Sequence, residues 1–479
     1  MIRPIAKTLL HTIAATIACA AVFLAIILWR LSTGPISLAF LAPYVEQALN
    51  FEGASYRVNF KDLRLIWAGW ERTLDVRASD VQCFSTDGAL LATFPETAVE
   101  FSIAAMLRGI IAPTKLELFR PDLHFNRDAN GVLDHDINEA SRRNSRITFA
   151  DAIGRALRVQ RIDNHLSYLQ SVRIVDGSLV IYDPDLKPRW AATRANVIIE
   201  RSSNGLRAEL ELKMDLDGSF VDLEIEAQLS RENGLINADI SFSPVEPKRL
   251  SRITSLLSPL EGINVALNGR ATIVADLNLD VQEATFKFTG GPGNLSIQDI
   301  FPGNATLNIT SLRVEGILEP GIQKLTLEEV FVNSENTTIN ANGSIQGEWS
   351  RPTIEADIVV ENLPLSRIDE FWPQTLAQGA RQWITGRILH GTVQRLDAHL
   401  NLKPGDWKND IADRETIYGQ FTVVEGTVNY FPGLPVAEKL ALTGWYDGID
   451  LHLDISDGLL ANQNLRDVTV SLSDINGQD

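Results

Sequence analysis

Apolar and polar side chains alternate with a period of two along most of the chain after residue 56. Within residues 208–230, Leu210 and Leu212 point to one side of an extended chain, whereas Glu209 and Glu211 point to the other. The alternation resumes after a Gly turn. This segment therefore predicts an antiparallel hairpin with one wet face.

The same pattern recurs at least five more times, with turn residues about every 8–12 positions. A sandwich closes after about seven to nine strands, and no linker rich in Gly, Ser or Pro divides this longer series. We therefore expect a mainly β protein, with an elongated, curled antiparallel sheet that forms a hydrophobic groove. The recurring segments are 263–280, 305–318, 353–362, 396–404 and 440–456.

The inward positions of these strands are the candidates for the lining of the groove. They are chosen by periodicity alone, so a register error of one residue would exchange the inner and outer faces. The candidates are Leu210, Leu212, Val221, Leu223, Ile225, Val265, Leu267, Ile273, Leu307 and Ile309.

Helical spacing interrupts the strands in a few places. Leu38, Leu41, Val45 and Leu49 predict a helix that Pro43 could kink. Residues 150–170 predict a helical insertion, and residues 251–260 also read as helix. Pro and aromatic residues within 364–384 predict a broken helical pair.

Residues 8–29 contain no Asp, Glu, Lys or Arg. As a helix they would span a hydrocarbon core of about 30 Å, which predicts an uncleaved transmembrane anchor. Arg3 and Lys7 precede the segment and Arg30 follows it, which favours a cytoplasmic N-terminus. A cleaved signal peptide and lipidation at Cys19 are the weaker alternatives. In a Gram-negative bacterium the bulk of the chain would then be periplasmic.

These patterns divide the chain into eight regions. They are a cytoplasmic N-terminus (1–7), the anchor (8–29), a membrane-proximal helix or linker (30–55), a first β region (56–146), a helical insertion (147–170), a repetitive β-groove (171–362), a Trp- and Pro-containing helical insertion (363–390) and a further β-groove (391–479).

Charge and cysteine content narrow the possible partners. The net charge of −18 repels phosphodiester backbones, so nucleic acid is not an expected partner. Cys19 lies in the predicted anchor and Cys83 lies far from it, so no disulfide is expected. The β-sheet has to be stabilised by packing.

Catalytic and metal-binding motifs are weak. The seven histidines form no H-x-x-x-H pair, and no nucleophile elbow, phosphate loop or dinucleotide fingerprint occurs. Asp134, His135 and Asp136 are the tightest polar cluster, and a solvated loop explains them more simply. We therefore expect no enzyme activity, metal or cofactor.

Three passages resemble a known family. An anchor followed by FRPDLHFNRDANGVL and VRIVDGSLVIYD resembles the AsmA-like superfamily, which also includes proteins related to the TamB type. FWPQTLAQGARQWITGRILHGTV and VNYFPGLPVAEKLALTG resemble passages of its YhdP branch. The residues that carry this second resemblance are Trp372, Pro373, Arg381, Trp383, Gly391, Tyr430, Pro432, Pro435 and Gly444.

The resemblance implies an inner-membrane-anchored, bridge-like protein that carries phospholipid across the periplasm to the outer membrane. Members of this branch are typically much longer than 479 residues, so the chain could be truncated or completed by a partner at its open edge. The alternative is an envelope-assembly or scaffold protein that binds outer-membrane or periplasmic proteins through its β surface and transports no lipid.

Overall fold

The computed structural model describes two compact units. Unit 1 comprises residues 1–184 and 189–213, and unit 2 comprises residues 185–188 and 214–479. The boundary after residue 213 falls inside one strand of the predicted region 171–362. The described residues are 18, 22, 29–30, 34–50, 56–66, 75–85, 90–102, 105, 108, 112–127, 133–135, 168–182, 190–216, 218–251, 260–296, 306–348, 351–372, 378–404, 406, 416–431, 433–448 and 450–473.

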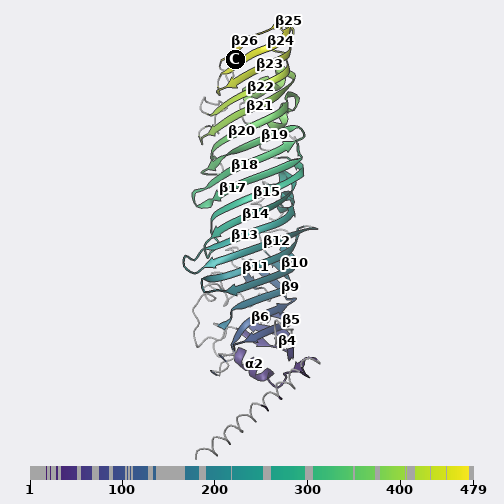
Figure 1. Cartoon of the computed structure of the whole chain (residues 1–479), viewed down its shortest axis with the longest axis vertical. Coiled ribbons are helices and arrows are strands. Elements are labelled where there is room, and N and C mark those ends of the chain that lie inside the picture. Colours follow the sequence, from purple (N-terminus) through teal and green to yellow (C-terminus); the bar gives the residue numbers. More distant parts are fainter. Residues whose placement is uncertain are drawn as a thin grey trace, which may run out of the picture. The chain divides into compact units, whose positions relative to one another are not determined.

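In its described residues, unit 1 is a β-sheet with a short helix packed against it. Val45 of the helix and Leu38 before it pack on buried Leu63, Ala78 and Val81. Its elements are β1 (Ile36–Ser37), α2 (Ala42–Leu49), β2 (Tyr56–Asn59), β3 (Asp62–Ile66), β4 (Asp75–Ser85), β5 (Leu90–Phe101), β6 (Pro113–Phe119), β7 (Asp122–Arg127), β8 (Leu133–His135), β9 (Ser171–Tyr182), β10 (Trp190–Arg201) and β11 (Gly205–Leu216), which crosses the division (Figure 1).

The predicted helix near residue 40 is present but starts later than expected. Leu38 and Leu41 precede α2, and Pro43 lies in its first turn and does not kink it. Proline suits this position because the first-turn amide groups have no partner inside the helix. The predicted first β region, 56–146, opens with two short strands, β2 and β3, which both pair with β4.

Unit 2 is one antiparallel meander in which each long strand pairs with the next (Figure 1). Its elements are β12 (Ser219–Ser230), β13 (Ile236–Val245), α5 (Pro247–Leu250), β14 (Ile263–Ala275), β15 (Val281–Leu295), β16 (Leu307–Ile309), β17 (Ser311–Glu319), η4 (Pro320–Ile322), β18 (Lys324–Ser334), β19 (Thr337–Gln346), β20 (Thr353–Pro364), η5 (Leu365–Arg367), α6 (Ile368–Phe371), α7 (Gln378–Arg387), β21 (Ile388–Leu402), β22 (Ile417–Val428), β23 (Ala437–Tyr446), β24 (Leu451–Leu460), β25 (Gln463–Leu465) and β26 (Val468–Leu472).

The meander has two different margins. Along one margin, which we call the turn margin, the described connections include tight turns, for example η4 between β17 and β18. Along the other margin, which we call the helical margin, the connections include α5, β16 and the helices η5, α6 and α7. These helices confirm the broken helical pair predicted within 364–384, and they do not divide the sheet, because β20 pairs directly with β21.

The sheet of unit 2 is curled, and β-bulges contribute to the curl. Register shifts occur between β21 and β22, between β22 and β23, and between β23 and β24. Glu425 and Lys439 adopt left-handed φ values of 52° and 51° near these shifts. Bulges bend a strand and increase its twist, so a series of them on neighbouring strands curves the whole sheet.

Three sequence-based predictions fall on residues that lie outside the described part. They are the helix at 251–260, nearly all of the helical insertion at 147–170, and most of the membrane anchor at 8–29. In the described part of the chain, we find no helix with the length and apolar character needed to cross a membrane.

Candidate functional site

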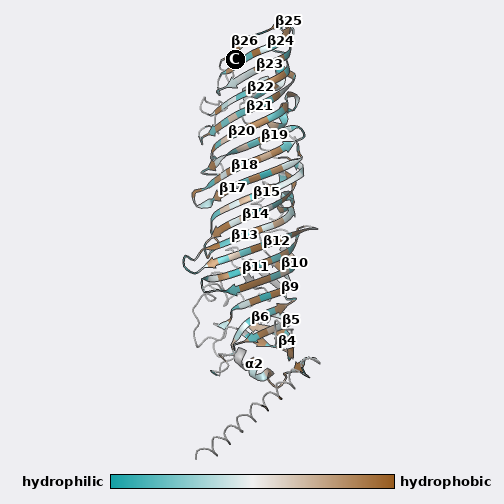
Figure 2. Ribbon diagram, viewed as in Figure 1, coloured by the Kyte–Doolittle hydropathy of each residue, from teal (hydrophilic) through white to brown (hydrophobic). Residues whose placement is uncertain are grey.

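Among the residues that the structure describes, one face of the unit 2 sheet carries no charged side chain. Residues opposite one another across each strand pair form rungs that run from β12 to β26, and the hydropathy colouring alternates along each strand accordingly (Figure 2). One rung consists of Leu223, Phe242, Gly269, Phe288, Val314, Val330, Ala341, Ile358, Ala398, Gly419, Tyr446, Leu451 and Leu472.

The next rung toward the helical margin is also uncharged. It lies two residues along each strand except β13, where a register shift separates Phe242 from Val245, so it occupies the same face of the pleated sheet. We call this common surface the apolar face. The second rung consists of Val245, Leu267, Gly290, Leu312, Val332, Ile339, Val360, Leu396, Phe421, Gly444, Leu453 and Val470.

The structure places eight of the ten candidate lining residues on the apolar face of unit 2. Leu223, Ile225, Leu267 and Ile273 are half-buried, while Val221 and Val265 are buried. Leu307 and Ile309 are buried on β16, which pairs with β15 at the helical margin. The other two, Leu210 and Leu212, are half-buried on β11, in unit 1.

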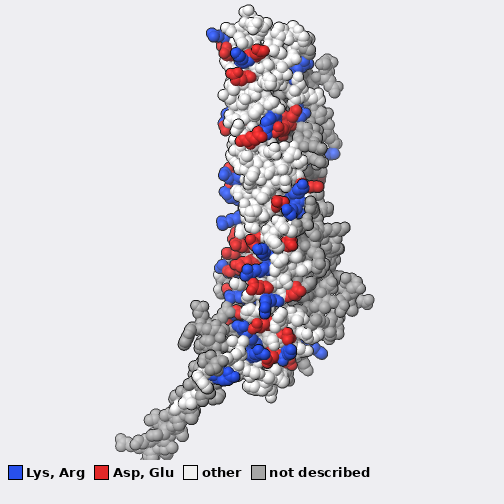
Figure 3. Space-filling model, turned by 90° about the vertical axis from the view of Figure 1, so that its right-hand side faces the viewer, with Lys and Arg blue, Asp and Glu red and all other residues white. Residues whose placement is uncertain are grey.

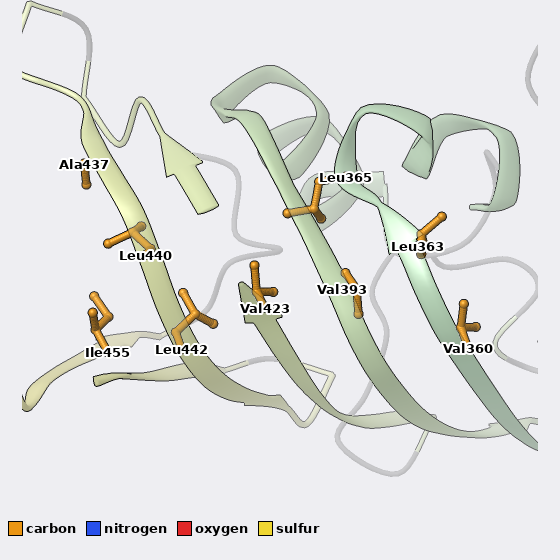
Figure 4. Packing of buried hydrophobic residues seen from close by; sticks show 9 residues of the cluster. All are labelled: Val360, Leu363, Leu365, Val393, Val423, Ala437, Leu440, Leu442 and Ile455. Carbon is orange, nitrogen blue, oxygen red and sulfur yellow. The ribbon is translucent and has the colours of Figure 1, made fainter. Parts of the chain in front are cut away.

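Burial differs across the width of the apolar face. In the middle of the strands, Phe288, Val314, Ile358 and Ala398 are only half-buried. Toward the helical margin the side chains form a buried cluster, whose members lie on the inner side of the bent strands (Figure 4). That cluster consists of Val360, Leu363, Leu365, Val393, Val423, Ala437, Leu440, Leu442 and Ile455.

Phe371 on α6 connects this cluster to a second one. Its ring packs against the cluster just described and against that of Val265, Leu307, Ile309 and Val332. The helical margin is therefore closed by packed side chains, whereas the middle of the apolar face keeps partial access to solvent.

Arg367 fastens these helices to the sheet. Its guanidinium donates hydrogen bonds to Glu370 (2.6 Å), Glu335 (2.9 Å) and the buried Ser334 hydroxyl (3.2 Å), and it lies over the Phe371 ring. The hydrogen bond to Glu370 raises the pKa of Arg367 above its ordinary value. The guanidinium thus links η5 and α6 to the turn between β18 and β19 and contacts the Phe371 ring.

Aromatic rings cover glycines on the apolar face. Phe242 and Phe288 flank Gly269 across β13, β14 and β15, with their ring centroids 5.8 Å apart. A Cβ atom on Gly269 would lie 2.4 Å from the Phe288 ring and 2.5 Å from the Phe242 ring. Phe286 stacks on Phe288 at 5.1 Å. These three rings are not among the ten candidate lining residues, although their spacing on the inward face could have revealed them.

The opposite face, which we call the polar face, carries paired charges. Arg313 donates to Glu329 (3.0 Å), and Arg395 donates to both Glu361 (3.0 Å) and Asp397 (2.6 Å). On the view in Figure 3, basic and acidic side chains lie beside one another in patches that uncharged surface separates. Such pairs keep a sheet face hydrated and contribute little to stability individually.

The two passages that resemble the AsmA-like superfamily lie side by side in unit 1. β6 and β7 both run parallel to β9, and Pro121 between them packs at Gly177. The Ser178 amide donates to the Pro121 carbonyl (2.8 Å), and the Ser178 hydroxyl donates to Asp122 (2.5 Å).

The residues of the other resemblance have structural positions in unit 2. Arg381 bonds Asp369 (2.9 Å) and the Trp372 carbonyl (3.4 Å), and Trp383 is half-buried on α7. Gly391 has a φ of 133°, which favours glycine. The remaining members divide as follows: Gly444 is buried, Tyr430 and Pro435 are exposed, and Pro373 and Pro432 lie outside the described residues.

The polar cluster near residue 135 lies partly on a strand, which corrects the expectation of a solvated loop. Asp134 and His135 lie on β8, which pairs with β7, and Asp136 lies outside the described residues. Among the residues that the structure describes, no group of three or more His, Cys, Asp or Glu side chains is arranged to hold a metal ion.

Comparisons with protein-family models, with curated proteins and with solved structures found no match to this chain.

Proposed function

We propose that the apolar face of unit 2 is a groove that binds the acyl chains of phospholipids, and that the protein carries phospholipid between two membranes without catalysis. The observation that carries this proposal is the uncharged face that stays in register from β12 to β26. Acyl chains need a continuous apolar path, because a single charge on that path costs several kcal/mol to desolvate.

Partial burial supports binding of a ligand over simple core packing. A sheet face that serves only as a core is covered by other elements until its large side chains are buried. Phe286, Phe288 and Leu327 are half-buried instead. A contiguous apolar surface of this kind marks an interaction site, and acyl chains fit its length and its lack of polar groups.

The different margins suggest how a lipid is held. The side chains around Phe371 close the helical margin, while the described connections at the turn margin include short turns such as η4. We infer that acyl chains lie along the middle of the apolar face and that headgroups leave past the turn margin into water. The ion-paired polar face keeps the outer side of the sheet hydrated.

The membrane setting is a further part of this proposal. Residues 8–29 would anchor the chain in the inner membrane of a Gram-negative bacterium, with the bulk of the chain in the periplasm. The resemblance to the YhdP branch of the AsmA-like superfamily supports transport toward the outer membrane. The resemblance and the apolar face support this proposal independently.

Site-specific photocrosslinking in living cells tests the proposal. The full chain would carry p-benzoylphenylalanine in place of Phe286 on the apolar face or, as the matched control, in place of Phe331, which pairs with Arg313 on the polar face. We expect phospholipid adducts at position 286 and none at position 331, detected by mass spectrometry of the purified protein.

Two results would overturn the proposal. Equal lipid labelling at both positions would show that the apolar face has no special affinity for lipid. Protein adducts at position 286 without lipid would favour the scaffold alternative, in which envelope proteins bind the sheet.

A further inference from the structure

Three ring side chains form a strip on the polar face of unit 2, near its last strands. Trp445 on β23 and His452 on β24 face each other across the strand pair and stack at 3.9 Å with an interplanar angle of 18°. Gln420 on β22 lies opposite Trp445, and Tyr418 lies two residues before Gln420. Tyr418 is therefore the diagonal neighbour of Trp445 on the same face. We call Tyr418, Trp445 and His452 the aromatic strip.

The aromatic strip is exposed where the rest of the face is polar. Tyr418 is 50% exposed and Trp445 is 38% exposed. Within the described part of the chain, the Tyr418 side chain makes no hydrogen bond and no ring contact. Large aromatic side chains that stay in water on a wet sheet face mark a binding surface.

Neutral hydrogen-bonding groups surround the strip. The Gln420 amide and the Thr422 and Thr443 hydroxyls lie on the same face of β22 and β23. His452 Nδ1 shares a hydrogen bond with the Ser471 hydroxyl (2.9 Å), so its ring is held in position against Trp445. On the other side, His399 lies opposite Tyr418 and bonds Asp357 (2.8 Å).

The charges near the strip exclude some ligand classes. Arg395, the basic side chain on the adjoining rung, is occupied by Glu361 and Asp397. Asp454 and Asp357 add exposed negative charge. A phosphate-rich or otherwise anionic polymer is therefore repelled. Because hydroxyl and amide groups surround the rings where aliphatic side chains would be needed, a lipid surface is not favoured.

We propose that the aromatic strip binds an uncharged glycan chain. A hexose presents C–H groups on its faces and hydroxyls around its edge, which matches rings flanked by amide and hydroxyl groups. The strands lie about 4.8 Å apart, which is close to the length of one sugar unit in an extended β-linked chain. Because His452 covers one face of the Trp445 ring, successive sugars would stack on Tyr418 and on the other face of Trp445, on the neighbouring strands β22 and β23.

The glycan site is independent of the proposed lipid groove. It lies on the opposite face of the sheet, so a variant of the strip leaves the apolar face unchanged. Failure of one proposal therefore leaves the other standing.

Isothermal titration calorimetry of the full chain tests the glycan site. The protein would be kept in an amphipol without sugar groups and titrated with β-1,4-linked hexasaccharides of glucose and of N-acetylglucosamine. We expect at least one of them to bind, and Trp445→Ala or Tyr418→Ala to weaken that affinity by about tenfold, the size of one stacking contact. Phe220→Ala, which removes an exposed ring elsewhere in unit 2, should leave the affinity unchanged.

Three results would overturn the proposal. They are the absence of binding by both hexasaccharides at millimolar concentration, binding that survives Trp445→Ala and Tyr418→Ala, and binding that Phe220→Ala weakens equally. Circular dichroism of each variant shows whether the sheet is intact. If Trp445→Ala does not fold, Trp445→Phe replaces it, with a smaller expected loss.

Discussion

The Phe421 ring lies over Gly444, its cross-strand partner on β23. A Cβ atom on Gly444 would sit 2.5 Å from Cζ of that ring. An aromatic residue paired with a glycine in this way shields the glycine backbone from solvent. The position of Gly444 in a family-like passage therefore has a packing explanation.

Gly444→Ala should destabilise unit 2 by about 1–3 kcal/mol, because the added methyl group displaces a packed ring. Chemical denaturation followed by circular dichroism measures this loss. Gly386→Ala is the matched control, since a Cβ atom there meets no atom within 4 Å on α7. It should stabilise the helix by up to about 1 kcal/mol. Equal effects of the two substitutions would contradict the packing explanation.

Local alternation was enough to predict the strands and the wet and dry faces, because both depend only on neighbouring residues. At a bulge, however, the alternation no longer identifies which residues face inward. On β22, Phe421 and Val423 face inward, but after the left-handed Glu425 the inward residues are Gly426 and Val428. A sequence read with a strict period of two would place Gly426 and Val428 on the wrong face.

The parts of the site that were not predicted depend on strand register. Phe371 contacts two clusters whose members are spread from residue 265 to residue 455. Trp445 stacks on His452 through the pairing of β23 with β24. No short sequence pattern encodes such contacts, because each requires the register of the whole meander.

Lys439 carries backbone strain at a bulge. Its φ of 51° is left-handed, a conformation that costs an ordinary residue about 1–2 kcal/mol. Lys439→Gly should therefore stabilise unit 2 by about 1 kcal/mol, while Lys439→Val should destabilise it, because β-branched residues rarely adopt this φ. Urea titration of both variants tests the prediction. A destabilised Gly variant would mean that the lysine side chain matters more than the strain.

Arg367 should contribute more to the free energy of unfolding than an exposed ion pair does. Arg367→Met removes hydrogen bonds to Glu370, Glu335 and Ser334, and we expect a loss of about 1–3 kcal/mol. Hydrogen exchange should quicken at η5 and α6. In the matched control, Arg313→Met breaks the exposed pair with Glu329 and should cost no more than about 1 kcal/mol. Unchanged exchange at α6 would argue against the anchoring role.

Cys83 makes unit 1 sensitive to alkaline pH. Burial raises the pKa of this thiol above its ordinary value of 9.0. A raised folded-state pKa contributes stability below the unfolded-state pKa, and that contribution disappears as the pH rises through the folded value. The stability advantage of the wild type over Cys83→Ala should therefore shrink between about pH 7 and about pH 10. A difference that stays constant across this range would disprove the linkage.

Adjacent residues on β20 allow the sharpest test of the apolar face. Ile358 lies between Ala341 and Ala398, whereas Val359 lies between Asn340 and Asp397 on the polar face. Both side chains are half-buried, so the substitutions differ mainly in the face that receives the charge.

Ile358→Glu should abolish lipid binding, because an acyl chain that crosses the new carboxylate would have to desolvate it. Val359→Glu should leave lipid binding unchanged. Extraction and mass spectrometry of lipid bound to the purified full chain measure both, with circular dichroism to show that each variant folds. If Ile358→Glu does not fold, Ile358→Gln offers a milder polar change. Equal lipid content in both folded variants would mean that acyl chains do not travel along this face, whatever its apolar character.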